Sequence, residues 1–309
     1  MSQTEKKIVI SASRRTDIPA FYMDWFMDRI DRGFFNVTNP YNKITKKIDV
    51  SPDKIHTIVF WSKNYAPFLK AGFDKILRKM GYNLFFHFTI NSTSSLLEPE
   101  VPFLDERLLQ LRLLCENNGS KSVVWRFDPV CYYKTKSGKV ENNLAGFPKI
   151  AEKVSALGIS KCITSFAGQY RKIEKRVQFL KSRGEDVPLL IDIKSEKKIE
   201  IVKRMANLLY KKGIELALCS EEKLFSDITR KENITRSACI SGQVFADLFK
   251  GGVEGKRDYG QRAKLGCMCT KSVDIGSYEL HPCFNNCLFC YANPVIDVMV
   301  KKGNKGASL

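Results

Sequence analysis

Short apolar segments alternate along the chain with longer amphipathic ones. The short segments are rich in β-branched and aromatic residues and have the length of buried strands. The expected strands span residues 7–13, 57–63, 84–90, 122–127, 161–166, 187–193 and 214–219. Between them apolar residues recur at helical spacing, as at Leu104, Leu108, Leu111 and Leu114. The expected helices span residues 19–32, 66–80, 104–118, 144–157, 171–183, 196–212 and 235–249.

This alternation of strands and helices predicts an α/β fold with a parallel sheet covered by helices. Seven strands with crossover helices favour a (β/α) barrel of the TIM type, complete or lacking a strand. An open doubly wound sheet is the alternative, although no glycine-rich dinucleotide motif follows the first strand. We expect one domain, with the barrel over residues 1–250, a cysteine-rich segment over 251–300 that folds over the barrel mouth, and a flexible basic tail over 301–309.

Polar residues cluster where the predicted strands end. In a (β/α) barrel these ends share one mouth, where such folds carry their chemistry. The candidate catalytic residues at these positions are Arg14, Arg15, Asp17, Lys63, Arg126 and Asp128. Arginine suits carboxylate or phosphate groups, so Arg14, Arg15 and Arg126 could hold an anionic substrate. Alternatively, these arginines pair with Asp17 and Asp128 and tie the barrel rim together.

Three cysteines near the C-terminus have the spacing Cys-x-x-x-Cys-x-x-Cys, at Cys283, Cys287 and Cys290. Cysteine thiolates are the usual ligands of iron–sulfur clusters. Three of them can hold three corners of a four-iron cluster and leave one iron open to another molecule. The sequence therefore predicts a reactive metal centre here.

The other seven cysteines fall into two groups. Cys115, Cys131 and Cys162 lie in or near predicted helices and strands and are expected to be small buried apolar residues. Cys219 ends a strand, Cys239 is expected at the start of a helix or within it, and Cys267 and Cys269 form a close pair. These four could hold a second centre, either another four-iron cluster or a tetrahedral zinc ion, with plain burial as the alternative for Cys219 and Cys239.

Charge and cysteine content indicate which partners and which cellular compartment to expect. The chain carries 51 Lys and Arg against 33 Asp and Glu, a net charge of +18, which makes nucleic acid a candidate partner. The same residues could instead form the solvated faces of helices. No apolar stretch has the length of a membrane span, and ten cysteines without a signal peptide indicate reduced thiols in the cytoplasm. We therefore expect no membrane partner; the sequence does not predict an oligomeric state.

The terminal motif, with Phe289 directly before Cys290, resembles the cluster signature of the radical S-adenosylmethionine superfamily. The resemblance implies a four-iron cluster whose open iron binds S-adenosylmethionine, a protein that supplies the reducing electron, and a substrate radical. It also implies that Phe289, Tyr291 and Asn293 lie on the cofactor side. In that superfamily the motif usually follows the first barrel strand, whereas here it comes last; a barrel brings its two ends together, so a late loop can reach the same mouth.

Nearly the whole chain also resembles an uncharacterised bacterial family with a radical-SAM-like cysteine cluster at its C-terminus. The matching segments are residues 11–19, 59–64, 125–129 and 267–293. We expect an iron–sulfur enzyme of the radical S-adenosylmethionine type that acts on an unidentified, anionic substrate. The alternatives are a basic nucleic-acid-binding or repair-associated protein with a structural metal site, and a zinc-stabilised barrel resembling a hydrolase.

Overall fold

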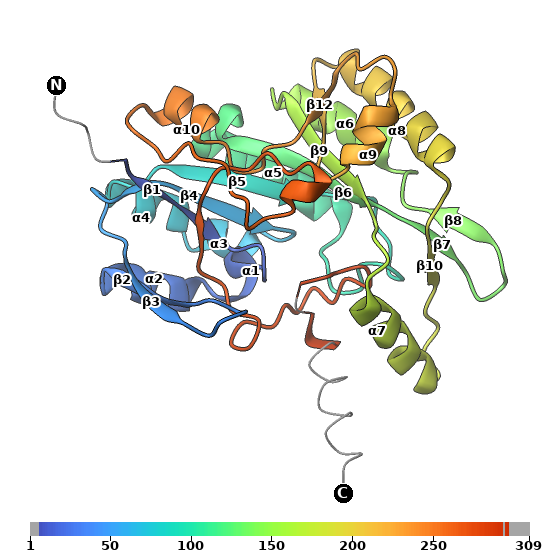
Figure 1. Cartoon of the computed structure of the whole chain (residues 1–309), viewed down its shortest axis with the longest axis horizontal. Helices are drawn as coiled ribbons and strands as arrows, with labels where there is room; N and C mark the ends of the chain where they lie inside the picture. The colour runs from blue at the N-terminus through green and yellow to red at the C-terminus, as the bar shows by residue number, and fades with distance from the viewer. Residues whose placement is uncertain (1–5, 293, 297–309) are drawn as a thin grey trace, which may run out of the picture.

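A large parallel sheet forms the centre of the molecule in the computed structural model, which describes residues 6–292 and 294–296 (Figure 1). The sheet has eight strands in the order β12-β11-β9-β6-β5-β4-β1-β13. Their bounds are β1 Ile8–Ala12, β4 Ile55–Ser62, β5 Leu84–Thr89, β6 Val123–Val130, β9 Lys161–Phe166, β11 Glu215–Leu218, β12 Ile234–Arg236 and β13 Val273–Asp274. All paired neighbours run parallel, which confirms the predicted α/β class.

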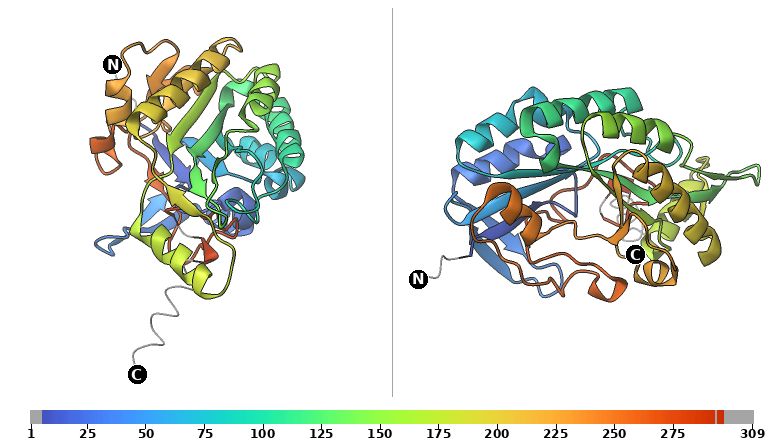
Figure 2. Two further views of the ribbon diagram at one scale, coloured as in Figure 1. Left: turned by 90° about the vertical axis from the view of Figure 1, so that its right-hand side faces the viewer. Right: turned by 90° about the horizontal axis from the view of Figure 1, so that it is seen from above.

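The sheet separates two layers of side chains, because residues two apart on a strand face the same side. Phe60 and Phe86 face outward and join the largest apolar cluster, with the helices. Phe85 and Val124 face inward and join a second cluster that includes Cys267. In the right-hand view of Figure 2 most of the helices lie along one side of the curved sheet, and the orange C-terminal segment lies along the other, together with the helix at residues 242–249.

Ten α-helices are present in the described part of the chain. Their bounds are α1 Ile18–Phe21, α2 Met23–Asp31, α3 Ala66–Lys70, α4 Phe73–Lys79, α5 Leu104–Asn118, α6 Phe147–Ala156, α7 Arg171–Ser182, α8 Ser195–Tyr210, α9 Glu222–Asp227 and α10 Gly242–Phe249. The predicted helix over 66–80 is two helices, because Gly72 takes a left-handed conformation at φ 67° and interrupts the helix between α3 and α4. The predicted helix over 19–32 is likewise divided at Tyr22.

Two predicted elements were wrong in type or place. The segment predicted as a strand over 187–193 gives β10 (Leu189–Ile191), which joins β7 (Tyr132–Lys134) and β8 (Val140–Asn142) in a separate antiparallel sheet. The predicted helix over 235–249 begins instead with β12, and α10 starts only at Gly242. A further hairpin, β2 (Phe34–Thr38) with β3 (Thr45–Asp49), was not predicted.

The C-terminal segment spans the open side of the curved sheet. Near one edge, the Met268 and Thr270 amides donate to carbonyls of the loop that follows β12, at 3.3 and 2.9 Å. At the other edge, β13 pairs with β1. Among the described residues β12 and β13 do not pair with each other, so these residues show no closed barrel. The sequence predicted that this segment folds over the mouth of a barrel; because the described residues show no closed barrel, that arrangement stays a prediction.

The structure contains no membrane-length apolar helix within residues 6–292 and 294–296. The predicted basic tail, residues 301–309, lies outside the described residues.

Candidate functional site

One tier of the inner face is polar. On each strand of this tier, the residue two positions after the apolar residue of the inner cluster has a side chain that can form hydrogen bonds, carry a charge or bind a metal. The inward residues of this tier, in chain order, are Ser11, Trp61, His87, Arg126, Ser165 and Cys219. They face the same side because strand residues alternate. Sequence reasoning had noticed Trp61 and His87 without assigning them a role; the alternation of neighbouring strands is the signal that groups them.

Trp61 is the centre of this tier. The ring of His87 stacks on it at 4.1 Å between centroids, and the guanidinium carbons of Arg14 and Arg126 each lie 5.4 Å from the Trp61 ring. The indole nitrogen donates to Ser11 Oγ at 3.1 Å. Two cations against one aromatic ring are held by cation–π attraction, which is stronger away from water. The predicted anion-binding arginines Arg14 and Arg126 therefore do meet.

His87 is buried and neutral at neutral pH. Burial lowers its pKa to about 4. Its Nε2 lies 2.7 Å from the carbonyl oxygen of Cys239, so this nitrogen carries the proton and donates. Nδ1 is then an acceptor; it is buried and has no partner within the part of the chain that the structure describes. A ligand with a donor group would satisfy it.

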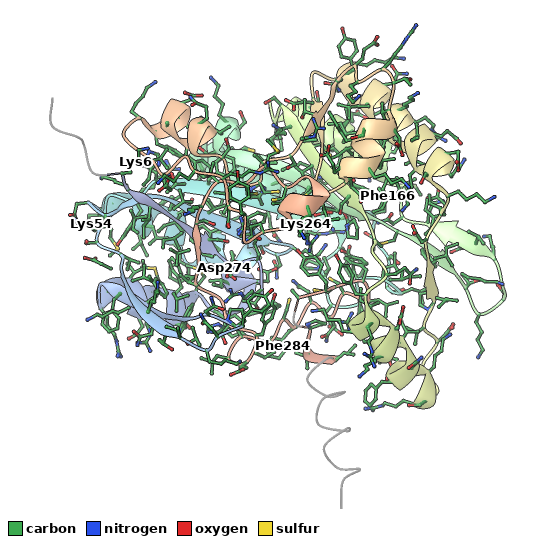
Figure 3. The ribbon with its side chains drawn as sticks, in the orientation of Figure 1. Lys6, Lys54, Phe166, Lys264, Asp274 and Phe284 are labelled. Carbon is green, nitrogen blue, oxygen red and sulfur yellow. The ribbon has the colours of Figure 1, made fainter. Side chains whose placement is uncertain are left out.

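Asp274 anchors the loop after β1, and sequence reasoning missed it as a site residue. Its carboxylate accepts the backbone amide of Arg14 at 2.8 Å and the hydroxyls of Ser11 and Ser13. Arg15 lies 3.9 Å from it and also donates to the carbonyl of Gly276 at 2.7 Å. In Figure 3 Asp274 lies on the C-terminal segment beside β1, and Phe284 lies further along that segment.

The predicted ion pairs at the rim form in part. Arg126 pairs with Asp128. Arg15 pairs with Asp274 rather than Asp17, and both terminal nitrogens of Arg14 are buried with no partner among the described residues. The expected pairing of arginines with Asp17 was therefore wrong, because the carboxylate of Asp17 is already occupied by other donors.

Asp17 links the first loop to the terminal cysteine motif. It caps α1 through the Ala20 amide and accepts from Ser62 Oγ at 2.6 Å and from the Lys63 amide at 2.9 Å. The side chain of Asn285 donates to it at 2.8 Å. Burial raises the pKa of Asp17, and these hydrogen bonds oppose the rise. Asp17 thus positions the loop that carries Cys283 and Cys287; its predicted catalytic role stays a prediction.

Lys63 lies near the second cysteine of the motif. Its ammonium group is 2.5 Å from Glu98 and 5.4 Å from the ring of Phe289. Burial raises the pKa of Cys287, and the charge of Lys63 opposes that rise. Arg107 is 1% exposed; burial lowers its pKa, the charges of Glu98 and Cys287 oppose that shift, and two of its nitrogens have no partner among the described residues. Two buried cations beside this thiol favour an anionic occupant.

The terminal motif is collected in one loop, named here the trio loop, with Cys283, Cys287 and Cys290. Arg176 on α7 donates to the carbonyls of Leu288 at 2.5 Å and Cys290 at 2.8 Å. Tyr22 donates to the carbonyl of Pro282. The last motif in the sequence is therefore held by α7 and by Tyr22, which lies between α1 and α2; its role as a cluster motif stays a prediction.

The residues expected on the cofactor side have different surroundings. Phe289 is buried in an apolar cluster with Ile173 and Val177 of α7. Tyr291 lies 5.6 Å from the ring of Tyr170. Asn293 lies outside the described residues. Their role toward a cofactor stays a prediction.

The side chains of the second group of cysteines, Cys219, Cys239, Cys267 and Cys269, also lie close together. Cys219 directly follows β11, and Cys239 lies in the loop after β12 rather than in a helix as predicted. Their sulfur atoms are 3.7 Å apart. Thiol contacts continue from Cys239 to Cys269 and from Cys269 to Cys267. Hydrogen bonds from Cys219 and Cys269, with the charge of Arg126, hold the pKa of Cys239 well below its usual value.

As the side chains stand, no group of three or more His, Cys, Asp or Glu residues in the described part of the chain is arranged to hold a metal ion. Cys115, Cys131 and Cys162 are buried among apolar residues, as predicted.

Comparisons with known proteins identify a family without giving an activity. No curated protein matches the chain. A sugar phosphate isomerase/epimerase from Parabacteroides distasonis is 10% identical over 94% of this chain and 93% of that chain, with a TM-score of 0.33. The D-hydantoinase of a Bacillus species is 14% identical over 59% of this chain, which spans 38% of its length, with a TM-score of 0.31. Over residues 9–292 the chain matches the model of a domain of unknown function, DUF1848, and it belongs to that family.

Proposed function

We propose that the protein is an iron–sulfur enzyme of the radical S-adenosylmethionine type, built on an incomplete (β/α) barrel and acting in the cytoplasm. The observation that supports this most directly is the position of the trio loop. Asn285 between its first two cysteines bonds to Asp17 in the loop after β1. The motif thus lies beside the end of the first strand, where the superfamily it resembles carries its cluster.

The residues around the trio loop suit a four-iron cluster. Cys283, Cys287 and Cys290 would hold three of its corners, and cluster ligands need not surround one point as the ligands of a single ion do. Thiol ligands must lose their protons, and burial alone would keep Cys287 protonated. Lys63 and Arg107 counter this by favouring negative charge at that sulfur. The chemistry that such a cluster supplies, when bound, is one-electron cleavage of S-adenosylmethionine to a radical that removes a hydrogen atom from the substrate.

The polar tier would hold an anionic substrate. Arg14 has two buried nitrogens without a partner among the described residues, and His87 has an unpartnered acceptor. A carboxylate or phosphate that also carries a hydroxyl or amine can satisfy both groups. The ring of Trp61 and the apolar layer below it would exclude water from the reacting centre. Asp128 keeps Arg126 oriented through their ion pair.

The test begins with anaerobic reconstitution by iron and sulfide. The protein is then incubated with dithionite and S-adenosylmethionine, and 5′-deoxyadenosine is measured by chromatography. We expect product from the unaltered chain, none above background from Cys287→Ala, and unchanged product from Cys115→Ala, which removes a buried cysteine on α5. A chain with a full cluster that forms no 5′-deoxyadenosine would contradict the proposal.

A second pair of variants tests how the trio loop is held. Arg176→Met removes the two donors to the carbonyls of Leu288 and Cys290, so we expect a lower iron content after reconstitution and faster amide exchange over residues 283–292. Lys175→Met changes an exposed neighbour on the same helix and should leave both unchanged. Equal exchange in the two variants would show that α7 does not hold this loop.

A further inference from the structure

We propose that Cys219, Cys239, Cys267 and Cys269 bind a metal as thiolates and form a second centre, inside the curved sheet and separate from the trio loop. The centre is a tetrathiolate site for zinc or for an iron–sulfur cluster. It stands on its own geometry and does not depend on the proposed radical chemistry.

The topology of the sheet brings the first two thiols together. Cys219 follows β11 and Cys239 follows β12, and these strands are parallel neighbours, so their ends lie at the same edge. The two sulfur atoms are 3.7 Å apart. In a tetrahedral site with metal–sulfur bonds of about 2.3 Å, neighbouring sulfurs lie about 3.8 Å apart. This pair already has the separation of two ligands of one zinc ion.

Backbone hydrogen bonds bring the other two thiols to the same place. The Met268 amide donates to the carbonyl of Ser237, two residues before Cys239, at 3.3 Å. The amide of Ile240 donates to the sulfur of Cys269 at 3.4 Å. Cys267 and Cys269 lie on a stretch without helix or strand, so their side chains can turn toward Cys219 and Cys239 without breaking an element. That rotation would bring the four sulfurs around a metal, an arrangement that the described residues do not have as they stand.

The charges around the thiols are the second, independent observation. Arg126 donates to the sulfur of Cys239 at 3.0 Å. Arg14 faces the same group: Cys269, Cys239 and Cys267 act on it electrostatically together with Asp274, and its terminal nitrogens are buried without a partner among the described residues. Buried cations are stabilised by negative charge placed beside them. Four thiolates with a divalent metal carry a net charge of −2, which complements the two guanidinium groups of Arg14 and Arg126.

The experiment separates this centre from the trio loop. A variant with Cys283, Cys287 and Cys290 all changed to Ala is purified without oxygen, and its zinc, iron and acid-labile sulfide are measured per chain. We expect about one zinc, or about four irons with four sulfides. X-ray absorption at the edge of the metal that is found should show a shell of sulfur atoms at about 2.3 Å, with four sulfurs if the metal is zinc. This measurement leaves Cys219, Cys239, Cys267 and Cys269 unaltered.

Two further variants in the same background assign the ligands. Changing Cys239 and Cys269 to Ser should remove the metal, and changing Cys162 to Ser should leave it, because Cys162 lies in β9 and faces the outer cluster. Purification of the trio variant without metal, or a metal without sulfur ligands, would overturn the proposal. If the unaltered chain forms no 5′-deoxyadenosine while the metal is present at these four cysteines, that result would instead count against the radical chemistry alone.

Discussion

Single residues near the C-terminus determine how the loop after β1 is placed. Asp274 accepts the amide of Arg14, and the carbonyl of Gly276 accepts the side chain of Arg15. Gly276 also lets Ser13 come close, since a Cβ atom on it would lie 2.6 Å from the Cβ of Ser13. The two strand-end arginines thus owe their positions to backbone and carboxylate groups from the other end of the sequence.

Gly276→Ala tests this close approach. The added methyl group would overlap the side chain of Ser13, so the loop after β1 must shift, and we expect the free energy of unfolding to fall by about 1–3 kcal/mol. Gly255→Ala is the matched control, because a Cβ there meets nothing within 4 Å. Denaturant unfolding measures both. Equal stability of the two variants would show that the contact with Ser13 does not restrict residue 276.

Sequence reasoning found the candidate residues on the strands but not their partners. Alternation along each strand and the rule that strand ends share one edge were enough to propose Arg14, Arg15 and Arg126 together. The partner of Arg15 could not be found, because Asp274 pairs with β1 only once the C-terminal segment has folded onto the sheet. The nearer carboxylate, Asp17, accepts four other donors instead.

At the scale of elements, the strands buried on both faces were predicted and the short or exposed ones were misplaced. β4, β5 and β6 consist mostly of apolar residues and are buried along nearly their whole length, and all three were expected. β12 has three residues, Ile-Thr-Arg, which are too few to show the alternation typical of a strand. Most of its residues were therefore assigned to the helix that follows. Cys239 was placed in a helix for the same reason. β10 was found as a strand, but its antiparallel partner β7 was not, so its sheet could not be assigned.

The burial of His56 between β4 and the end of α10 should make the stability of the fold depend on pH. His56 on β4 bonds to the carbonyl of Lys250, just beyond α10, at 2.9 Å. Burial lowers the pKa of His56, this hydrogen bond opposes the shift, and the charge of Lys7 adds to it. As pH falls, the unfolded chain therefore takes up its proton first, at an ordinary pKa of about 6.5. The folded state should lose stability below that pH.

His56→Gln measures this contribution. We expect the unaltered chain to lose stability more steeply than the variant between pH 7 and pH 5, by at most about 1.4 kcal/mol per pH unit for one proton. Unfolding in denaturant at several pH values gives both slopes. His87 and His281, whose pKa values are also lowered, are present in both proteins, so the difference isolates His56. Parallel slopes would mean that His56 keeps its ordinary pKa in the folded state.

At the scale of the whole molecule, the C-terminal segment joins the two edges of the sheet. It bonds to the loop after β12 through the amides of Met268 and Thr270, and it pairs with β1 through β13. The sequence predicted a segment that folds over the barrel mouth, but a two-residue strand such as β13 leaves no pattern to detect. The alternative of a nucleic-acid-binding protein, whose affinity would fall steeply with salt, depends on the net charge of +18 and stays a prediction.

If this segment couples the two edges, a change at one edge should loosen the other. Asp274→Asn removes a charge that accepts hydrogen bonds from Ser11, Ser13 and the amide of Arg14, so we expect a loss of about 1–3 kcal/mol in the free energy of unfolding. Amide exchange followed by mass spectrometry should quicken in β13 and also in β12, at the far edge of the sheet. Asp186→Asn, in an exposed loop, is the control and should change neither strand. Faster exchange confined to β1 and β13 would show that the two edges of the sheet open independently. A segment that only lies across the sheet would not carry the loss of stability at Asp274 to the loop that contains Cys239.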